Sequence, residues 1–116
     1  MSRDRGVEEG LRQELRRGTL VLAVLAALRR ELCGADLIGF LATAGVVIEP
    51  GALYPMLRRL EDQGLLASEW RVDEGRRRRF YVASANGSAI AATLVQDLSS
   101  LTEGLRTLME MTDDAA

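Results

Sequence analysis

Histidine and lysine are absent from the 116 residues, and cysteine occurs once, as Cys33. Without histidine the chain lacks the side chain most often used in acid–base catalysis. One cysteine without histidine also falls short of the ligand set of a zinc site. The 11 glycines are scattered along the chain rather than gathered in a phosphate-binding loop. We therefore expect no enzymatic activity, no catalytic residue, no metal site and no cofactor.

Long apolar runs are also missing. The longest, Leu20 to Leu28, is far shorter than the ~20 residues that span a bilayer, so it predicts a buried helix. The chain opens with charged residues, unlike a secretory signal, and one cysteine cannot form an internal disulfide. These absences predict a cytoplasmic protein without a membrane partner. The length predicts a single domain with one core.

The formal net charge is −2, but the charges are unevenly distributed. Residues 51–81 hold seven arginines and five acidic residues, for a local charge of +2, and the remainder holds eight arginines and twelve acidic residues, for −4. Phosphate binding responds to local charge, because ordinary salt screens the field within about 8–10 Å. The basic segment therefore predicts an anion-binding surface.

The segment from Pro50 to Gly64 predicts one short helix. Proline suits the first turn, where its missing N–H would have no partner, and Gly64 can adopt the left-handed conformation that closes a helix. Helical spacing places an apolar face toward the core, made of Leu53, Leu57 and Leu60.

Tyr54 and Arg58 are four residues apart, so they share a different face of this helix, and Arg59 lies further round. Tyrosine hydroxyls and guanidinium groups are typical donors to phosphate, and Arg58 is the candidate for a base edge. On this segment alone, an amphipathic helix with a solvated outer face is the favoured interpretation. The residues after Gly64 decide between the two interpretations.

Residues 65–72 and 76–82 read as two strands joined by a turn at 73–75. The return strand begins with four arginines, Arg76 to Arg79. Because successive strand side chains point to opposite faces, about two of the four are expected to grip phosphates; the alternative is a solvated hairpin. A helix followed by a basic hairpin is the order of a winged helix-turn-helix, in which the helix enters the major groove.

Three further helices are expected before this unit. Val7, Leu11 and Leu15 form a narrow stripe on residues 7–17 that covers either the domain's own core or a partner subunit. Gly18 and Thr19 interrupt the pattern, and a central helix follows over 19–31. Residues 36–44 form another helix, with its apolar side chains inward: Leu37, Ile38, Phe40 and Leu41.

Smaller features complete the prediction. Residues 46–48 are a short strand or a turn. Cys33 is expected to be a small buried thiol rather than a redox switch, because only Arg29 and Arg30 are evident neighbouring cations. Trp70 is expected to be a buried ring on the first hairpin strand, with a role in a ligand pocket as the less favoured alternative.

Ser84 is a suitable cap for a last helix that runs to about residue 111. Its leucines recur in steps of four and three, which is a heptad seam: Leu94, Leu98, Leu101, Leu105 and Leu108. The seam either packs back on the core or pairs with a second subunit, and we favour the dimer. The expected organisation is an N-terminal helix or arm (1–17), a winged helix-turn-helix (18–83) and a dimerisation helix (84–116), mainly α with a small β-hairpin wing.

Several motifs, in order over roughly residues 16–110, resemble the PadR family of transcriptional regulators of the short, subfamily-2-like type. They are Gly18-Thr-Leu20, Gly51-Ala-Leu-Tyr-Pro-Met-Leu-Arg-Arg-Leu-Glu-Asp-Gln-Gly-Leu-Leu66, Ser68-Glu-Trp70, and Gly75-Arg-Arg-Arg-Arg-Phe-Tyr-Val-Ala-Ser84 with Gly87. The resemblance implies mostly repression, relieved by a small-molecule effector that the sequence does not identify.

The hypothesis is therefore a homodimeric, sequence-specific regulator bound to an inverted repeat in double-stranded DNA. The residues expected to contact DNA are Tyr54, Arg58, Arg59, Arg76, Arg77, Arg78 and Arg79. The alternative is a winged-helix protein-interaction module without DNA binding. Ala52, where the family usually has a hydroxyl residue, and the acidic total favour that alternative slightly.

Overall fold

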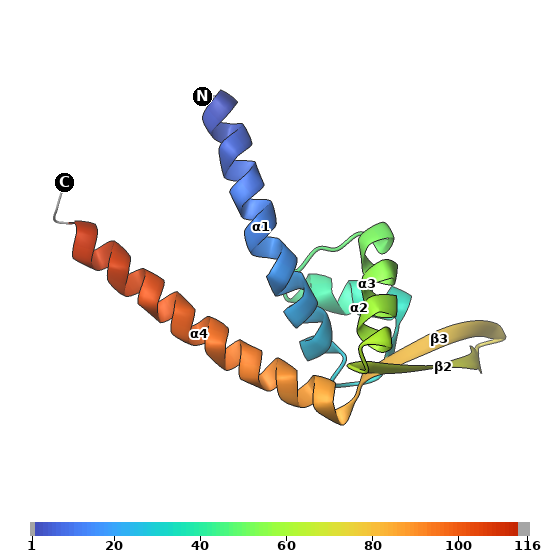
Figure 1. The fold of residues 1–116 in the computed structure, drawn as a ribbon. Helices are drawn as coiled ribbons and strands as arrows, with labels where there is room; N and C mark the ends of the chain where they lie inside the picture. Colours follow the sequence, from blue (N-terminus) through green and yellow to red (C-terminus); the bar gives the residue numbers. More distant parts are fainter. Residues whose placement is uncertain (1, 114–116) are drawn as a thin grey trace.

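The computed structural model describes residues 2–113; residues 1 and 114–116, at the ends of the two outer predicted segments, lie outside this range. The described chain is mainly helical, with a small antiparallel sheet (Figure 1). In chain order its elements are α1 (Ser2–Ala27), β1 (Leu32–Cys33), α2 (Gly34–Thr43), α3 (Pro50–Asp62), β2 (Leu66–Asp73), β3 (Arg76–Ala83) and α4 (Ala85–Asp113).

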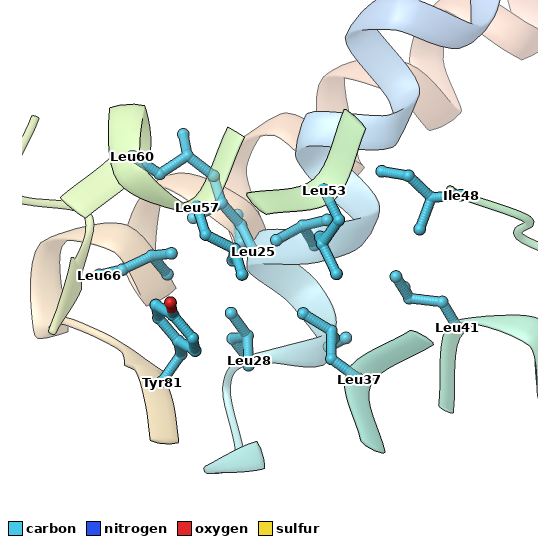
Figure 2. Packing of buried hydrophobic residues seen from close by; sticks show 13 residues of the cluster. Leu25, Leu28, Leu37, Leu41, Ile48, Leu53, Leu57, Leu60, Leu66 and Tyr81 are labelled. Carbon is cyan, nitrogen blue, oxygen red and sulfur yellow. The ribbon is translucent and has the colours of Figure 1, made fainter. Parts of the chain in front are cut away.

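The core lies where α1, α2, α3 and the base of the hairpin meet. Figure 2 shows the α3 leucines pointing toward leucines of α1 and α2, with Leu66 and Tyr81 of the hairpin closing the side. The predicted inner face of α3 is confirmed, because its leucines are almost inaccessible to solvent. Burying such a side chain contributes roughly 1.5–3 kcal/mol, so this face fixes the helix on the domain. The three residues are Leu53, Leu57 and Leu60.

Two predicted stops of α3 are confirmed. Pro50 occupies the first turn of the helix, and Gly64 has a φ of +76°, the left-handed conformation that glycine adopts without strain. The second proline, Pro55, lies within the helix without ending it. The helix is therefore held at a fixed length between two backbone signals that the sequence displays.

The hairpin is joined by a two-residue turn. Glu74 and Gly75 both have positive φ, 53° and 76°, as the type I′ turn requires, and this turn matches the twist of paired strands. Asp73 pairs with Arg76 next to the turn and Leu66 with Ala83 at the base. The predicted hairpin is confirmed, with each strand ending at most one residue from where it was expected.

A short strand was considered possible at residues 46–48, but the third strand of the sheet lies elsewhere. Residues 46–48 form no strand; Val46 instead donates its N–H to the carbonyl of Leu41, and Ile48 is buried in the core. The strand beside β3 is β1, whose Leu32 pairs with Tyr81, giving the sheet order β1-β3-β2. The start of α2 consequently lies beside the middle of the wing.

The predicted break at Gly18 and Thr19 is wrong, since α1 runs unbroken from Ser2 to Ala27. The Thr19 hydroxyl does not cap a new helix but donates within this one, to the carbonyls of Leu15 and Arg16. A single glycine costs a helix only about 1 kcal/mol relative to alanine. The strong helix formers on both sides outweigh that cost.

The outer ends of α1 and α4 diverge from a common base, opposite the hairpin (Figure 1). Their apolar stripes do not reach the core: Leu15 is 68% exposed and Leu101 is 64% exposed. The chain is elongated as a result, measuring 62 × 34 × 25 Å. Of the two alternatives for each stripe, packing on the domain's own core is wrong.

Ser84 caps α4 as predicted. Its Oγ accepts the N–H of Gly87 at 3.0 Å and donates to the carbonyl of Gly64 at 2.8 Å, which ties the start of α4 to the end of α3.

Phe40 of α2 does not face inward as predicted. Its ring is 39% exposed, with the Arg30 guanidinium 5.3 Å from the ring centre. None of the described helices combines the length and the hydropathy needed to cross a membrane.

Candidate nucleic-acid interface

The outer face of α3 carries Tyr54, Arg58 and Arg59, all exposed. Packing of the leucine face fixes which way these side chains point. The Tyr54 ring lies against the first residue of α2, Gly34, where a side chain would meet it. Within residues 4–113, whose side chains the structure describes, neither Arg58 nor Arg59 has a side-chain hydrogen bond or ion pair, unlike Arg78 and Arg79 of the wing. Both guanidinium groups are therefore available to a ligand.

The four wing arginines alternate between the two sides of the hairpin, as strand geometry requires. Arg77 and Arg79 stack on Trp70, whereas Arg78 approaches Cys33 on β1, with its Nη1 3.7 Å from the thiol sulfur. Arg78 also lies 3.8 Å from the carboxylate of Asp73.

Arg79 is engaged with α3. Its Nε donates to the Ser68 hydroxyl at 2.9 Å and its Nη2 to Glu61 at 3.1 Å, and Ser68 also hydrogen-bonds Glu61 at 2.6 Å. This network joins the hairpin to the C-terminal half of α3. In the described part of the chain, Arg76 and Arg77 alone among the four wing arginines have no carboxylate partner.

Trp70 is not the buried ring that was predicted. It is 52% exposed, because β2 extends beyond the core and leaves this residue over the open side of the hairpin. Cys33 is buried as predicted, but its neighbouring cation is Arg78 rather than Arg29 or Arg30. The correction at Cys33 results from the pairing of β1 with β3, which joins residues far apart in the sequence.

An open cleft of about 410 Å³ separates the start of α2, α3 and the hairpin. Its wall combines guanidinium groups, aromatic rings and the first residues of α2, and none of the described residues that line it is acidic. The lining residues are Cys33, Gly34, Ala35, Tyr54, Trp70, Arg76, Arg77, Arg78, Arg79 and Tyr81. A smaller hollow of about 300 Å³ continues along α3, and its lining includes Arg58 together with the acidic residues Glu61 and Asp62.

Three groups in this region have shifted pKa values. Burial is the main cause that raises the pKa of Tyr81. Hydrogen bonding to Cys33 raises the pKa of Arg78, and hydrogen bonding to Glu31 and then Glu69 raises that of Arg71 on the other face of the hairpin. At any physiological pH the lining of the cleft consequently includes a charged Arg78 and a neutral Tyr81 phenol.

Chemically, the arrangement suits an extended polyanion. Donors from α3 and the wing surround one cleft, and the guanidinium fork matches phosphate oxygens. Within residues 2–113, no three potential metal-ligating side chains gather into a site. Of the residues predicted to contact DNA, Tyr54 and Arg76 to Arg79 line this cleft, Arg58 lines the adjacent hollow and Arg59 lines neither. Gly34, which was not predicted, follows directly on β1, and Trp70 reaches the cleft through the pairing of β2 with β3.

The chain is similar in sequence to a known protein family. The profile of the PadR-like transcriptional regulator family matches residues 21–93. A curated relative, the transcriptional regulator Rv3488 of Mycobacterium tuberculosis, is 41% identical over 98 residues, covering 84% of this chain and 89% of the relative.

Solved structures show the same fold. A PadR family transcriptional regulator from Eggerthella lenta superposes with a TM-score of 0.83 at 37% identity, over 95% of this chain and 98% of the other. A PadR-like transcription factor from Bacteroides fragilis gives a TM-score of 0.71 at 26% identity, over 85% and 98% of the two chains. The chain therefore belongs to the PadR-like family of transcriptional regulators, whose function implies DNA binding.

Proposed function

We propose that this chain is a homodimeric repressor that binds an inverted repeat in double-stranded DNA and is released by a small-molecule effector. The observation that carries the DNA-binding part is the placement of Tyr54 of α3 and the four wing arginines around one cleft whose described lining holds no acidic residue. Operator binding of this kind takes place in the cytoplasm.

The recognition helix, α3, enters the major groove with its exposed face. Arg58 meets a base edge, while Arg59 and the Tyr54 hydroxyl donate to phosphates. Arginine reads guanine through two hydrogen bonds, each well-made pair discriminating by ~1–3 kcal/mol. The sugar–phosphate strand that borders this groove passes through the cleft between α3 and the wing, where Arg76 and Arg77 neutralise it.

The dimer forms through α4. Its leucine seam follows heptad spacing and is open to solvent from Leu94 to Leu108, and an exposed apolar stripe of this length is typical of an association surface. The exposed stripe on α1, with Leu11 at its centre, faces the same partner. A two-fold axis through the seam presents two recognition helices about one helical turn of DNA apart.

The effector acts on the relation between the two subunits. An open hollow of about 230 Å³ lies between α1 and α4 near their common base, lined by small side chains such as Ala26 and Ala91. A ligand seated there changes the angle of the helices that carry the dimer seam. Release of DNA requires that the ligand bind the altered arrangement more tightly than the operator-bound one.

The direct test is a titration of the protein with DNA from upstream of its own gene, at two salt concentrations and with a scrambled competitor. We expect tight binding that resists the competitor and weakens as salt rises. The Arg76→Ala/Arg77→Ala variant should weaken binding to all sequences and flatten the salt dependence, because each lost phosphate contact removes about one unit of slope. Arg58→Ala should instead relax sequence preference.

The second candidate is a winged-helix protein-interaction module, favoured by the acidic total charge and by Ala52 in the first turn of α3. Binding to upstream DNA no stronger than to the scrambled competitor would replace the proposed function with this one.

A further inference from the structure

The half-exposed Trp70 is in contact with two cations. On β2 it lies directly across from Arg79, and Arg77 is the next residue on the same side of β3. The Arg77 and Arg79 guanidinium carbons lie 5.0 Å and 5.6 Å from the ring centres of the indole. Both distances fall within the ~6 Å at which a cation is attracted to an aromatic face.

The two arginines differ in what else holds them. Arg79 is fixed by Ser68 and Glu61, so it needs no further support. For Arg77, the indole is the one polar or cation–π contact found in the part of the chain that the structure describes. Without the ring, Arg77 would be an exposed side chain free to sample many rotamers.

Stacking leaves the useful part of the arginine free. A guanidinium group contacts an aromatic ring through its flat face, whereas its N–H donors point outward in the plane of the group. Arg77 also lines the cleft. A stacked Arg77 therefore offers its donors to the cleft from a restricted set of orientations, which lowers the entropy lost when it binds an anion.

We infer that Trp70 is a positioning residue of the DNA interface, which orders Arg77 for contact with the phosphate backbone and does not itself contact DNA. The inference rests on the proposed function. The Arg79–Glu61 pair holds the hairpin against α3, so the stack sets where Arg77 stands relative to the recognition helix.

A double-mutant cycle on operator binding tests this arrangement. Trp70→Ala should weaken binding about fivefold, the size expected from one exposed cation–π contact and one side chain's ordering. Trp70→Phe, which keeps an aromatic face, should recover most of the loss. In the Arg77→Ala background, Trp70→Ala should cause no further loss, because its effect passes through Arg77.

Trp70 is the only tryptophan in the chain, so its fluorescence reports the stack without DNA. Arg77→Ala should make the indole more accessible to acrylamide quenching in the free protein. The matched control is Val72→Ala, which removes an exposed side chain opposite Arg77 on the same strand as Trp70. It should change neither thermal stability nor operator affinity appreciably.

The outcomes separate the possible failures. Independent, multiplicative losses for Trp70→Ala and Arg77→Ala would overturn the inference, because the effect of Trp70 would then not pass through Arg77. Unchanged quenching in Arg77→Ala would overturn it as well, because the stack would then not exist in solution. If the unmodified protein does not select its operator over scrambled DNA, the proposed function fails, whatever the quenching shows.

Discussion

Gly34 and Tyr54 lie so close together that a side chain at position 34 would collide with the tyrosine. A Cβ atom at Gly34 would lie 2.6 Å from the Tyr54 hydroxyl oxygen and 2.7 Å from a ring carbon. The contact joins the first residue of α2 to the outer face of α3, at the wall of the cleft. It sets the position of one of the proposed phosphate donors.

Gly34→Ala should weaken operator binding roughly tenfold, about 1.4 kcal/mol. The added methyl group would push the Tyr54 ring aside, and the hydrogen bond that its hydroxyl is proposed to donate to a phosphate would be lost. Thermal stability should change little. The matched control is Gly39→Ala on the same helix, where an added Cβ meets nothing within 4 Å. Equal binding by the two variants in a fluorescence titration would remove Tyr54 from the interface.

Leu101→Glu should dissociate the proposed dimer, because two charges would be buried at the centre of an apolar seam. The expected result in sedimentation equilibrium is a monomer at concentrations where the unmodified protein is a dimer. Thr107→Glu, on the opposite face of the same helix by its spacing from the seam, should leave the dimer intact. A Leu101→Glu variant that sediments as a dimer would show that α4 is not the interface.

Gly87→Ala should destabilise the fold by about 2 kcal/mol or more, because the added Cβ would lie 2.1 Å from the backbone carbonyl oxygen of Leu65 and the backbone must shift.

Gly18→Ala should instead raise the free energy of unfolding. Gly18 lies within the continuous helix α1, with nothing within 4 Å of an added Cβ, so alanine should stabilise the helix by about 1 kcal/mol. Urea unfolding of the two variants measures both effects.

Stability should fall at strongly alkaline pH. Burial raises the pKa of Tyr81 in the folded protein above its ordinary value of 10.0. Above about pH 10 the unfolded chain therefore releases this proton while the folded chain keeps it, and the free energy of unfolding decreases as pH rises. Below pH 10 the contribution is fully present. In Tyr81→Phe, this part of the decrease should be absent from urea midpoints measured between pH 8 and 11.

The sequence by itself determined the features that local periodicity encodes. The leucine face of α3, its glycine stop at Gly64, the hairpin turn at Glu74 and Gly75, and the heptad seam of α4 all result from spacing and backbone preference within a few residues. These patterns were sufficient for the winged-helix fold and for the basic residues around the candidate site.

Only the tertiary structure decided which of those residues are free to act. The two-residue strand β1 has too little sequence to give a signal, yet its pairing with β3 places Cys33 beside Arg78. The same assembly leaves Trp70 half-exposed, with the guanidinium groups of Arg77 and Arg79 over its ring, and it forms the ion pair between Arg79 and Glu61. Contacts between residues far apart in the chain leave no local pattern, because the free energy that selects them comes from packing the whole domain.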